Sequence, residues 1–152
     1  MTPVRANDPD DWTALLALIH RAFAGMHGRI EPPSSLHRLT PDAIARQAEA
    51  GEVWVIGSPA IACVCLTPRE DHLYLGKLAV DPSAQRRGHA RRLIELALVR
   101  ARALGLPRLQ LETRIELVEN HATFRALGFS ESARTAHPGF DRPTALTFTR
   151  PV

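Results

Sequence analysis

The fold is decided by the stretch LYLGKLAVDPSAQRRGHARRLIELAL, residues 73–98. Residues 72–80 are rich in Leu and Val and predict a strand, which Asp81-Pro82 ends. From Ala90 onward, apolar residues recur at helical spacing while charged residues lie off that face. A further strand at residues 108–113 is reached through this helical crossover, so we expect it to pair parallel with the first strand.

The turn QRRGHA, residues 85–90, joins this strand to the helix and indicates an anion site. Unpaired N–H groups and the positive end of the dipole make a helix start suitable for a pyrophosphate. Gly88 would let the backbone approach the ligand, and the small Ala90 would let the helix pack tightly on the strand. Positive charge comes from Arg86, Arg87, Arg91 and Arg92. The alternative is an ordinary turn that needs a glycine, beside arginines that only solubilise the helix end. Neither GxxxxGK nor GxGxxG is present, which disfavours ordinary ATP or NAD sites.

The N-terminal part predicts two helices joined by a long loop. Asp8 can cap the first helix, with Pro9 at its first position and Asp10 and Asp11 in its first turn, and Gly25 can stop it. The following loop holds two prolines and no sustained period, and loops of this length often shape a binding site.

The remaining segments complete a single domain, residues 1–152. Thr40 and Pro41 open a second helix that Gly51 ends. Further strands are expected at residues 52–57, 60–66, 129–136 and 144–149, and a further helix at 117–127. The summed order is β, α, α, β, β, β, α, β, α, β, β.

Composition limits the class of protein. With 152 residues and 45% apolar content, the chain can bury one core but is too short for two ordinary domains. No apolar run approaches the roughly 20 residues of a membrane span, and residues 1–11 lack the pattern of a signal peptide. We therefore expect a cytoplasmic protein with no membrane partner.

The cysteines and histidines predict neither a disulfide nor a metal site. Cys63 and Cys65 lie two apart in an extended segment, so their Cα atoms would be roughly 6.6 Å apart, at the outer limit for a disulfide. We expect small core residues instead. The seven histidines show no metal-ligand spacing, and no CxxC accompanies them, so we expect no metal.

The excess of basic over acidic residues raises the possibility of a nucleic-acid partner, but other features of the sequence disfavour it. Net charge is +3, and 18 of the 19 basic residues are arginine, Lys77 being the exception. Aromatic residues make up only 5% of the chain, and the arginines are densest beside the turn at 85–90. Stacking platforms and a long basic face are therefore both lacking.

Three motifs together resemble the GNAT acetyltransferase family. Its pyrophosphate motif, Q/R-x-x-G-x-G/A, is matched by Gln85, Gly88 and Ala90. LYLGKLAVDP at 73–82 looks like the fourth strand of the family, and NHATFRALGF at 120–129 resembles its later helix that ends in Gly-Phe. The resemblance implies an α+β acyl-CoA N-acyltransferase fold. In that fold about four helices flank a mostly antiparallel sheet of about seven strands, whose parallel fourth and fifth strands splay apart.

The resemblance also implies acetyl-CoA as co-substrate, bound in the gap between the splayed strands. Backbone groups of Leu78, Ala79 and Val80 would bind the pantetheine arm, and Asn120 and Phe124 would approach it from the later helix. The residues expected around the pyrophosphate are Gln85, Arg86, Arg87, Gly88, His89, Ala90 and Arg91. Leu78, Val80 and Phe124 could equally be core residues, and Asn120, which lies closer to Gly-Phe than in many relatives, could cap its helix.

Acetyl transfer to an amine needs a base and a route for the thiolate to leave. LETR at 111–114 resembles a family segment in which the acidic residue faces the acceptor, so Glu112 is the candidate base. A surface carboxylate paired with an arginine is the alternative, and an ordered water could also relay the proton. Phe124 stands where many relatives have a tyrosine acid. Tyr74 is the only tyrosine and could substitute, or could be a packing residue.

Acceptor choice is expected to depend on loops. By resemblance, His137 in HPGFDRP borders the acceptor pocket with Asp141 and Arg142, although tight-turn chemistry explains that loop equally well. Arg29 and Glu31 in the first long loop are further candidates. The acceptor would be a small-molecule amine, a protein N-terminus or a lysine. Transfer of a larger acyl group and a coenzyme A-binding module without turnover remain open, as does the oligomeric state, a homodimer included.

Overall fold

The computed structural model describes residues 1–9 and 11–152 and shows one seven-stranded sheet. The strand order is β1-β2-β3-β4-β5-β7-β6, and every neighbouring pair is antiparallel except β4 and β5. The strands are β1 (Val4–Arg5), β2 (Glu52–Ile56), β3 (Ala62–Pro68), β4 (Leu73–Val80), β5 (Arg108–Arg114), β6 (Ser130–Thr135) and β7 (Ala145–Pro151). The predicted mixed sheet with a parallel fourth and fifth strand is confirmed.

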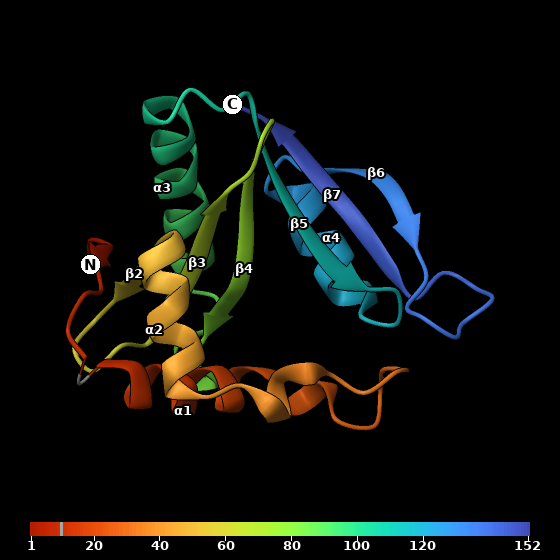
Figure 1. Cartoon of the computed structure of the whole chain (residues 1–152), viewed down its shortest axis with the longest axis horizontal. Helices are drawn as coiled ribbons and strands as arrows, with labels where there is room; N and C mark the ends of the chain where they lie inside the picture. The colour runs from red at the N-terminus through yellow and green to blue at the C-terminus, as the bar shows by residue number, and fades with distance from the viewer. Residues whose placement is uncertain (10) are drawn as a thin grey trace.

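Four α-helices flank the sheet, in the predicted order (Figure 1). They are α1 (Asp11–Phe23), α2 (Pro41–Ala50), α3 (His89–Ala103) and α4 (Val118–Ala126). The Thr40 side chain caps α2 by accepting a hydrogen bond from the Ala43 amide at 3.1 Å, as predicted. Asp10, expected in the first turn of the first helix, lies outside the described residues. No helix in the described part of the chain is long and apolar enough to cross a bilayer.

The long loop after α1 is more ordered than predicted. It contains two 3-10 turns, η1 (Ala24–Met26) and η2 (Ser35–Arg38), and a third, η3 (Pro82–Ala84), precedes α3. The Ser34 hydroxyl accepts a hydrogen bond from the Leu36 amide at 3.1 Å and starts η2. Such short turns lack the apolar period that identifies an α-helix, so the pattern used for the longer helices does not find them.

Two hydrophobic cores lie on opposite faces of the sheet. The α3-side core contains Leu93 and Ile94 of α3, with Leu109 and Leu111 of β5 and Phe148 of β7. The α1-side core joins residues of α1 and α2 to the other face of β2 to β4, and includes Trp12, Leu15, Ile44, Cys63 and Cys65. Both cysteines are free, buried thiols, as expected from their spacing.

A buried carboxylate fastens α3 to the edge of the sheet. Glu52 on β2 is only 6% exposed and accepts two hydrogen bonds from Arg100 of α3, at 2.8 and 2.7 Å. The Trp54 indole donates a third at 2.8 Å. The bond from Arg100 holds the pKa of Glu52 below its usual value although burial opposes this. The ion pair therefore orients the helix whose first turn forms part of the site described next.

Strands β4 and β5 pair only at their beginnings and then splay apart (Figure 1). Their parallel pairing is limited to Leu73 with Leu109 and Tyr74 with Gln110. In the described part of the chain, the rest of β4 therefore has no strand on its β5 side. This splay opens the middle of the molecule, and α1 with the following loop spans the open end (Figure 1).

A β-bulge reshapes β4 within the splay. Three residues of β3, from Cys63 to Cys65, face four residues of β4, from Ala79 back to Gly76, so β4 contains one extra residue. Lys77 lies in this bulge with φ of 53°, a left-handed conformation that side chains with a Cβ rarely adopt. Pairing of β3 with β4 continues on the far side of the bulge, at Cys63 with Ala79 and at Ala62 with Val80.

Candidate active site

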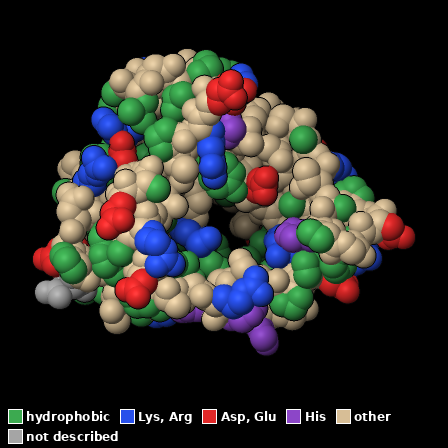
Figure 2. Space-filling view, in the orientation of Figure 1, with side chains coloured by type: hydrophobic (Ala, Val, Ile, Leu, Met, Phe, Trp, Pro, Cys, Tyr) green, Lys and Arg blue, Asp and Glu red, His purple; other side chains and the backbone are tan. Residues whose placement is uncertain are grey.

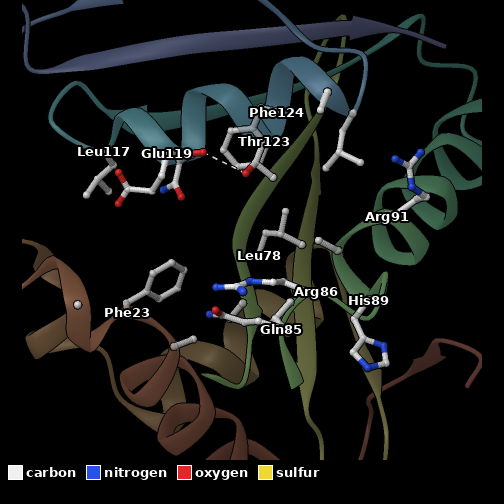
Figure 3. Close-up of a pocket in the computed structure, with 18 of the residues that line it drawn as sticks. Phe23, Leu78, Gln85, Arg86, His89, Arg91, Leu117, Glu119, Thr123 and Phe124 are labelled. Carbon is white, nitrogen blue, oxygen red and sulfur yellow. Dashed lines mark hydrogen bonds between the residues drawn. The ribbon is translucent and has the colours of Figure 1, made fainter. Parts of the chain in front are cut away.

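A cavity of about 770 Å³ lies at the splay. Its walls come from the end of α1, the second half of β4, the turn into α3 and the face of α4. In Figure 3, Phe124 and Leu117 of the α4 segment lie opposite Phe23 of α1, with Leu78 between them. Figure 2 shows the same region as a hollow between the two halves of the molecule, with Lys and Arg side chains at its margin.

The cavity gathers the residues predicted to bind the cofactor. Its lining includes Leu78, Ala79, Val80, Gln85, Arg86, Gly88, His89, Ala90, Arg91, Asn120 and Phe124. Arg87 alone among the predicted cofactor residues is not part of the lining, and its carbonyl accepts a hydrogen bond from Arg92 at 2.9 Å. Residues separated by up to about 45 positions thus meet at one cavity because the crossover helix α3 begins beside the end of β4 and α4 lies across the splay.

The turn before α3 presents an uncapped helix start to this cavity. Gly88 is the N-cap, with φ of 82°, and it supplies no side-chain cap. Arg86 is also left-handed, with φ of 63°. The first amides of a helix have no partner within the helix, so at this turn they are available to a ligand. Arg86 and Arg91 line the same cavity and add positive charge, which suits a pyrophosphate.

Other contacts hold this turn in place. The Asp81 side chain caps η3 by accepting a hydrogen bond from the Ser83 amide at 3.0 Å. Arg21 of α1 pairs with the Asp81 carboxylate at 2.9 Å, so the turn is tied to α1. His89 is 7% exposed, and its burial together with Arg92 lowers its pKa. A neutral His89 therefore occupies the first position of α3.

The second half of β4 offers an unpaired strand edge beside this helix start. Leu78, Ala79 and Val80 line the cavity, beyond the point where pairing with β5 ends. An unpaired strand edge presents backbone N–H and C=O groups that an extended ligand can bind as a neighbouring strand would. Leu78 and Val80 also pack against the α3-side core, so they serve the core and the cavity together.

From the opposite wall, α4 presents Asn120 and Phe124. The N-cap of α4 is Leu117, so Asn120 lies in the first turn and does not cap the helix. Its side chain approaches Thr113 of β5, with the amide nitrogen 3.4 Å from the hydroxyl. Phe124 contacts the rings of Phe129 and Phe148, with each centroid 6.1 Å away, and also lines the cavity. Its ring closes one side of the cavity and carries no ionisable group.

The predicted catalytic pair, Glu112 and Tyr74, lies at the paired end of the splay and does not line the cavity. Glu112 is exposed on β5, and within residues 1–9 and 11–152 no arginine forms an ion pair with it. Burial, with the negative charge of Glu112, raises the pKa of Tyr74 to about 12. Tyr74 therefore stays protonated and can donate a hydrogen bond, but it releases its proton less easily than an ordinary tyrosine.

The loop after η1 crosses to the other half of the molecule and is held there by polar contacts. Arg29 forms a two-fold pair with Glu119 of α4, at 2.6 and 3.0 Å. The Glu31 amide donates to Glu116 at 3.1 Å, and Arg114 donates to the Pro32 carbonyl at 2.7 Å. We call residues 27–33 the crossing loop. It closes the open end of the splay.

The three predicted substrate residues lie around this crossing loop, but only Arg29 lines the cavity. The carboxylate of Glu31 pairs with Arg142 of the β6–β7 loop at 3.1 Å. The backbone amide of His137 donates to the Thr144 hydroxyl at 2.9 Å, and its ring Nδ1 also contacts that hydroxyl. The structure thus brings Glu31 and the β6–β7 loop together, while His137 is held against its own loop.

Sequence reasoning missed several residues of the cavity wall. Phe23 and Met26 come from the end of α1 and from η1, Glu119 and Thr123 come from α4, and Leu117 is the N-cap of α4. In Figure 3, the Thr123 hydroxyl donates to the Glu119 carbonyl, at 3.0 Å. Phe23 packs against the α1-side core and also lines the cavity, and helical spacing alone cannot distinguish a core residue from a cavity residue at a helix end.

The model of the acetyltransferase (GNAT) family matches residues 12–129 of the chain. The chain belongs to the GNAT acetyltransferase family. No curated protein gives a significant sequence match to it. The matched range contains β4, the turn, α3, β5 and α4, so it includes every element that forms the cavity.

Solved GNAT structures share the whole fold. An acetyltransferase from Streptococcus agalactiae superposes with a TM-score of 0.76 at 17% identity, covering 99% of this chain and 97% of that chain. The ribosomal-protein-S18-alanine N-acetyltransferase from Escherichia coli gives 0.72 at 22% identity, covering 99% and 94%. The PaiA N-acetyltransferase from Thermoplasma acidophilum, solved with coenzyme A, gives 0.76 at 10% identity, covering all of both chains. At these identities the likeness establishes the fold.

Proposed function

We propose that this GNAT protein is an acetyl-CoA-dependent N-acetyltransferase, which moves an acetyl group from the thioester to a primary amine by direct attack. One observation carries the proposal. The unpaired edge of β4 and the uncapped start of α3 border the same cavity, so a single ligand with an extended arm and a diphosphate could bind both. Acetyl-CoA has both parts.

The residues of the cavity fit such a ligand. We assign the pyrophosphate to the amides of the turn at 86–91, with Gln85 beside them and arginine charge around them. The pantetheine arm would lie along Leu78 to Val80 and be covered by Phe124, with Asn120 at the start of α4. In the site of this family, acetyl-CoA supplies a thioester carbonyl that an amine can attack.

For the reaction, we assign the base to Glu112, directly or through an ordered water. Its exposed carboxylate has no arginine partner in the described chain, so it remains free to accept a proton. No residue of the described cavity wall supplies a tyrosine acid, since Phe124 stands in that place. A thiol pKa of roughly 8.5 makes the thiolate a fair leaving group, so turnover does not require such an acid. Tyr74 would at most donate a hydrogen bond.

The acceptor would enter beside the crossing loop and the β6–β7 loop. Arg29, Glu31 and His137 are our candidates for setting acceptor choice. The fold is shared with a ribosomal-protein-S18-alanine N-acetyltransferase and with the PaiA N-acetyltransferase. Our acceptor candidates are a small-molecule amine, a protein N-terminus and a lysine. We expect the reaction to take place in the cytoplasm.

Two tests separate this function from its alternatives. Calorimetry should show that acetyl-CoA binds, and thiol release should then rise when a suitable amine from a panel is added. Binding without release for any amine would favour a coenzyme A-binding module, which the phenylalanine at position 124 makes conceivable. Faster release from longer acyl thioesters would favour a transferase of larger acyl groups. Absence of binding would refute the proposal.

A further inference from the structure

Lys77 is the only lysine of the chain, and it lies in the bulge of β4 immediately before Leu78. Among the non-glycine residues that the structure describes, its φ of 53° is one of two left-handed values, and the other belongs to Arg86 in the turn before α3. Leu78, Ala79 and Val80 follow directly and line the cavity. The single side-chain amine of the protein is therefore adjacent in sequence to the strand edge that we assign to the thioester arm.

The bulge directs Lys77 away from the α3-side core. Leu75 and Leu78 both pack on that side, although two residues separate them, so Gly76 and Lys77 together occupy the opposite side. The positive charge of Lys77 opposes the rise in pKa that burial causes in Cys63 and Cys65. Both thiols belong to the α1-side core, which places the ammonium charge near the α1 face of the sheet.

Glu112 lies on this same face, across the splay. On β5, Leu109 and Leu111 pack in the α3-side core, and strand alternation directs Glu112 the other way. Lys77 and Glu112 thus flank the gap between β4 and β5 from one face. Within residues 1–9 and 11–152, no carboxylate forms an ion pair with the half-buried Lys77 ammonium. Lys77 does not itself line the cavity, so its side chain would have to turn toward the gap to reach the thioester.

We propose that Lys77 is an acetyl acceptor within the chain, so that the protein acetylates itself at the edge of its own site. This inference rests on the proposed function. The Lys77 amine attacks the thioester carbonyl carbon, an N–C bond forms, and the C–S bond breaks. The ammonium first loses one Nζ proton to Glu112 or to water, which makes the amine nucleophilic; a second Nζ proton passes to water after the attack, and coenzyme A leaves as the thiolate. The product is a neutral amide at residue 77, so the positive charge of Lys77 is lost from the α1 face of the sheet.

The test is simple because Lys77 is the only lysine, and the α-amino group of Met1 can serve as an internal reference. Met1 precedes β1, which is three strands from β4, about 14 Å at the usual strand spacing. After incubation with acetyl-CoA and no added amine, intact mass and peptide mapping should show one acetyl group, on Lys77. We expect this site to react more than ~10-fold faster than Met1, because binding holds the two reacting groups together.

Two variants show whether the site itself is responsible. Lys77→Arg keeps the charge but has no amine, so the acetyl group should not be added. Gly88→Asp keeps Lys77 but should impair binding of the thioester, so acetylation at Lys77 should slow to the rate of Met1. Equal rates at Lys77 and Met1 in the wild type, or unchanged acetylation of Lys77 in Gly88→Asp, would overturn the inference, since random chemical acetylation would then suffice.

A measurement without acetyl transfer tests the same placement. A small amine-reactive ester should label Lys77 in the free protein, and saturating coenzyme A should slow that labelling while leaving Met1 unaffected. Labelling of Lys77 that coenzyme A does not change would contradict the placement beside the arm. If coenzyme A is released when amines are added but Lys77 stays unmodified, self-acetylation fails and the proposed function stands. If acetyl-CoA does not bind at all, the proposed function fails first.

Discussion

The two sides of the candidate site are built in different ways. The side that we assign to the cofactor comes mainly from one continuous segment, β4 through the first turn of α3, in which each residue is placed by a strand, a turn or a helix start, and Asn120 and Phe124 of α4 complete it. The acceptor side comes from three distant segments, namely the crossing loop, β5 with the start of α4, and the β6–β7 loop. These segments are joined mainly by exposed ion pairs and single hydrogen bonds.

The fold therefore determines the cofactor side, whereas the acceptor side depends on surface side chains that can vary. A helix start and a strand edge bind through backbone groups, so many side-chain changes would leave them intact. The acceptor side depends on side chains such as Arg29 and Glu31, which can change without altering the sheet. We therefore expect substitutions on the cofactor side to affect binding most when they alter backbone geometry or charge at the turn.

The largest effect should come from Gly88→Asp. An aspartate must adopt the left-handed φ of 82°, and it would bring a negative charge to the assigned diphosphate. We expect acetyl-CoA affinity to fall by about 100-fold or more, measured by calorimetry. Gly88→Ala is the matched control, because a Cβ at this position would meet Arg92 at an ordinary 3.5 Å and adds strain without charge. Equal affinity in wild type and Gly88→Asp would show that the turn does not hold the phosphates.

Glu112→Gln should have the next largest effect, and on a different quantity. Removing a general base typically lowers kcat by about 100-fold or more, while cofactor affinity should be nearly unchanged. The readout is the pH–rate profile with the best acceptor, together with the affinity for acetyl-CoA. Tyr74→Phe is the companion variant, and its effect should be small because the phenol holds its proton so firmly. A Glu112→Gln enzyme with wild-type rate and profile would exclude Glu112 as the base.

The same contrast explains what the sequence could predict. Gly88 and Ala90 could be placed because a strand, a turn and a helix follow one another without interruption, so local pattern determines their positions. Arg29 could be named only as a member of a long loop, since its partner Glu119 is 90 residues away and no periodicity links them. The bulge at Lys77 was also missed, because one extra residue in a strand leaves the apolar composition unchanged.

A third variant tests whether the buried pair between Glu52 and Arg100 stabilises the fold. Glu52→Gln should lower the free energy of unfolding by about 1–3 kcal/mol, because it weakens the bonds from Arg100. The exposed Glu49→Gln on α2 should change it little. Chemical denaturation of both variants is the measurement, and equal stabilities would show that the buried pair contributes nothing.

The pH dependence of this contribution has a definite sign. The pKa of Glu52 is lowered in the folded state, so its stabilisation is complete above the unfolded value of about 4.3 and is lost as the pH falls toward the folded value. The stability difference between wild type and Glu52→Gln should therefore shrink on acidification below about pH 4. A difference that stayed constant to low pH would mean that the carboxylate charge is not its source.

The smallest effect is expected on the acceptor side, from Arg29→Gln. The guanidinium of Arg29 lowers the pKa of Glu119 to about 2, but both side chains are exposed, so the melting temperature should hardly change. If the pair positions the crossing loop for the acceptor, KM for the amine should rise by up to about tenfold, which corresponds to the free energy of one hydrogen bond. The affinity for acetyl-CoA should stay constant. Glu119→Gln should raise KM for the amine by the same factor. The double variant should raise it little further, because each single variant already removes the same contact. If KM for the amine stayed constant in all three variants, the crossing loop would be a structural tie between the halves of the molecule, and acceptor choice would have to depend on β5 and the β6–β7 loop.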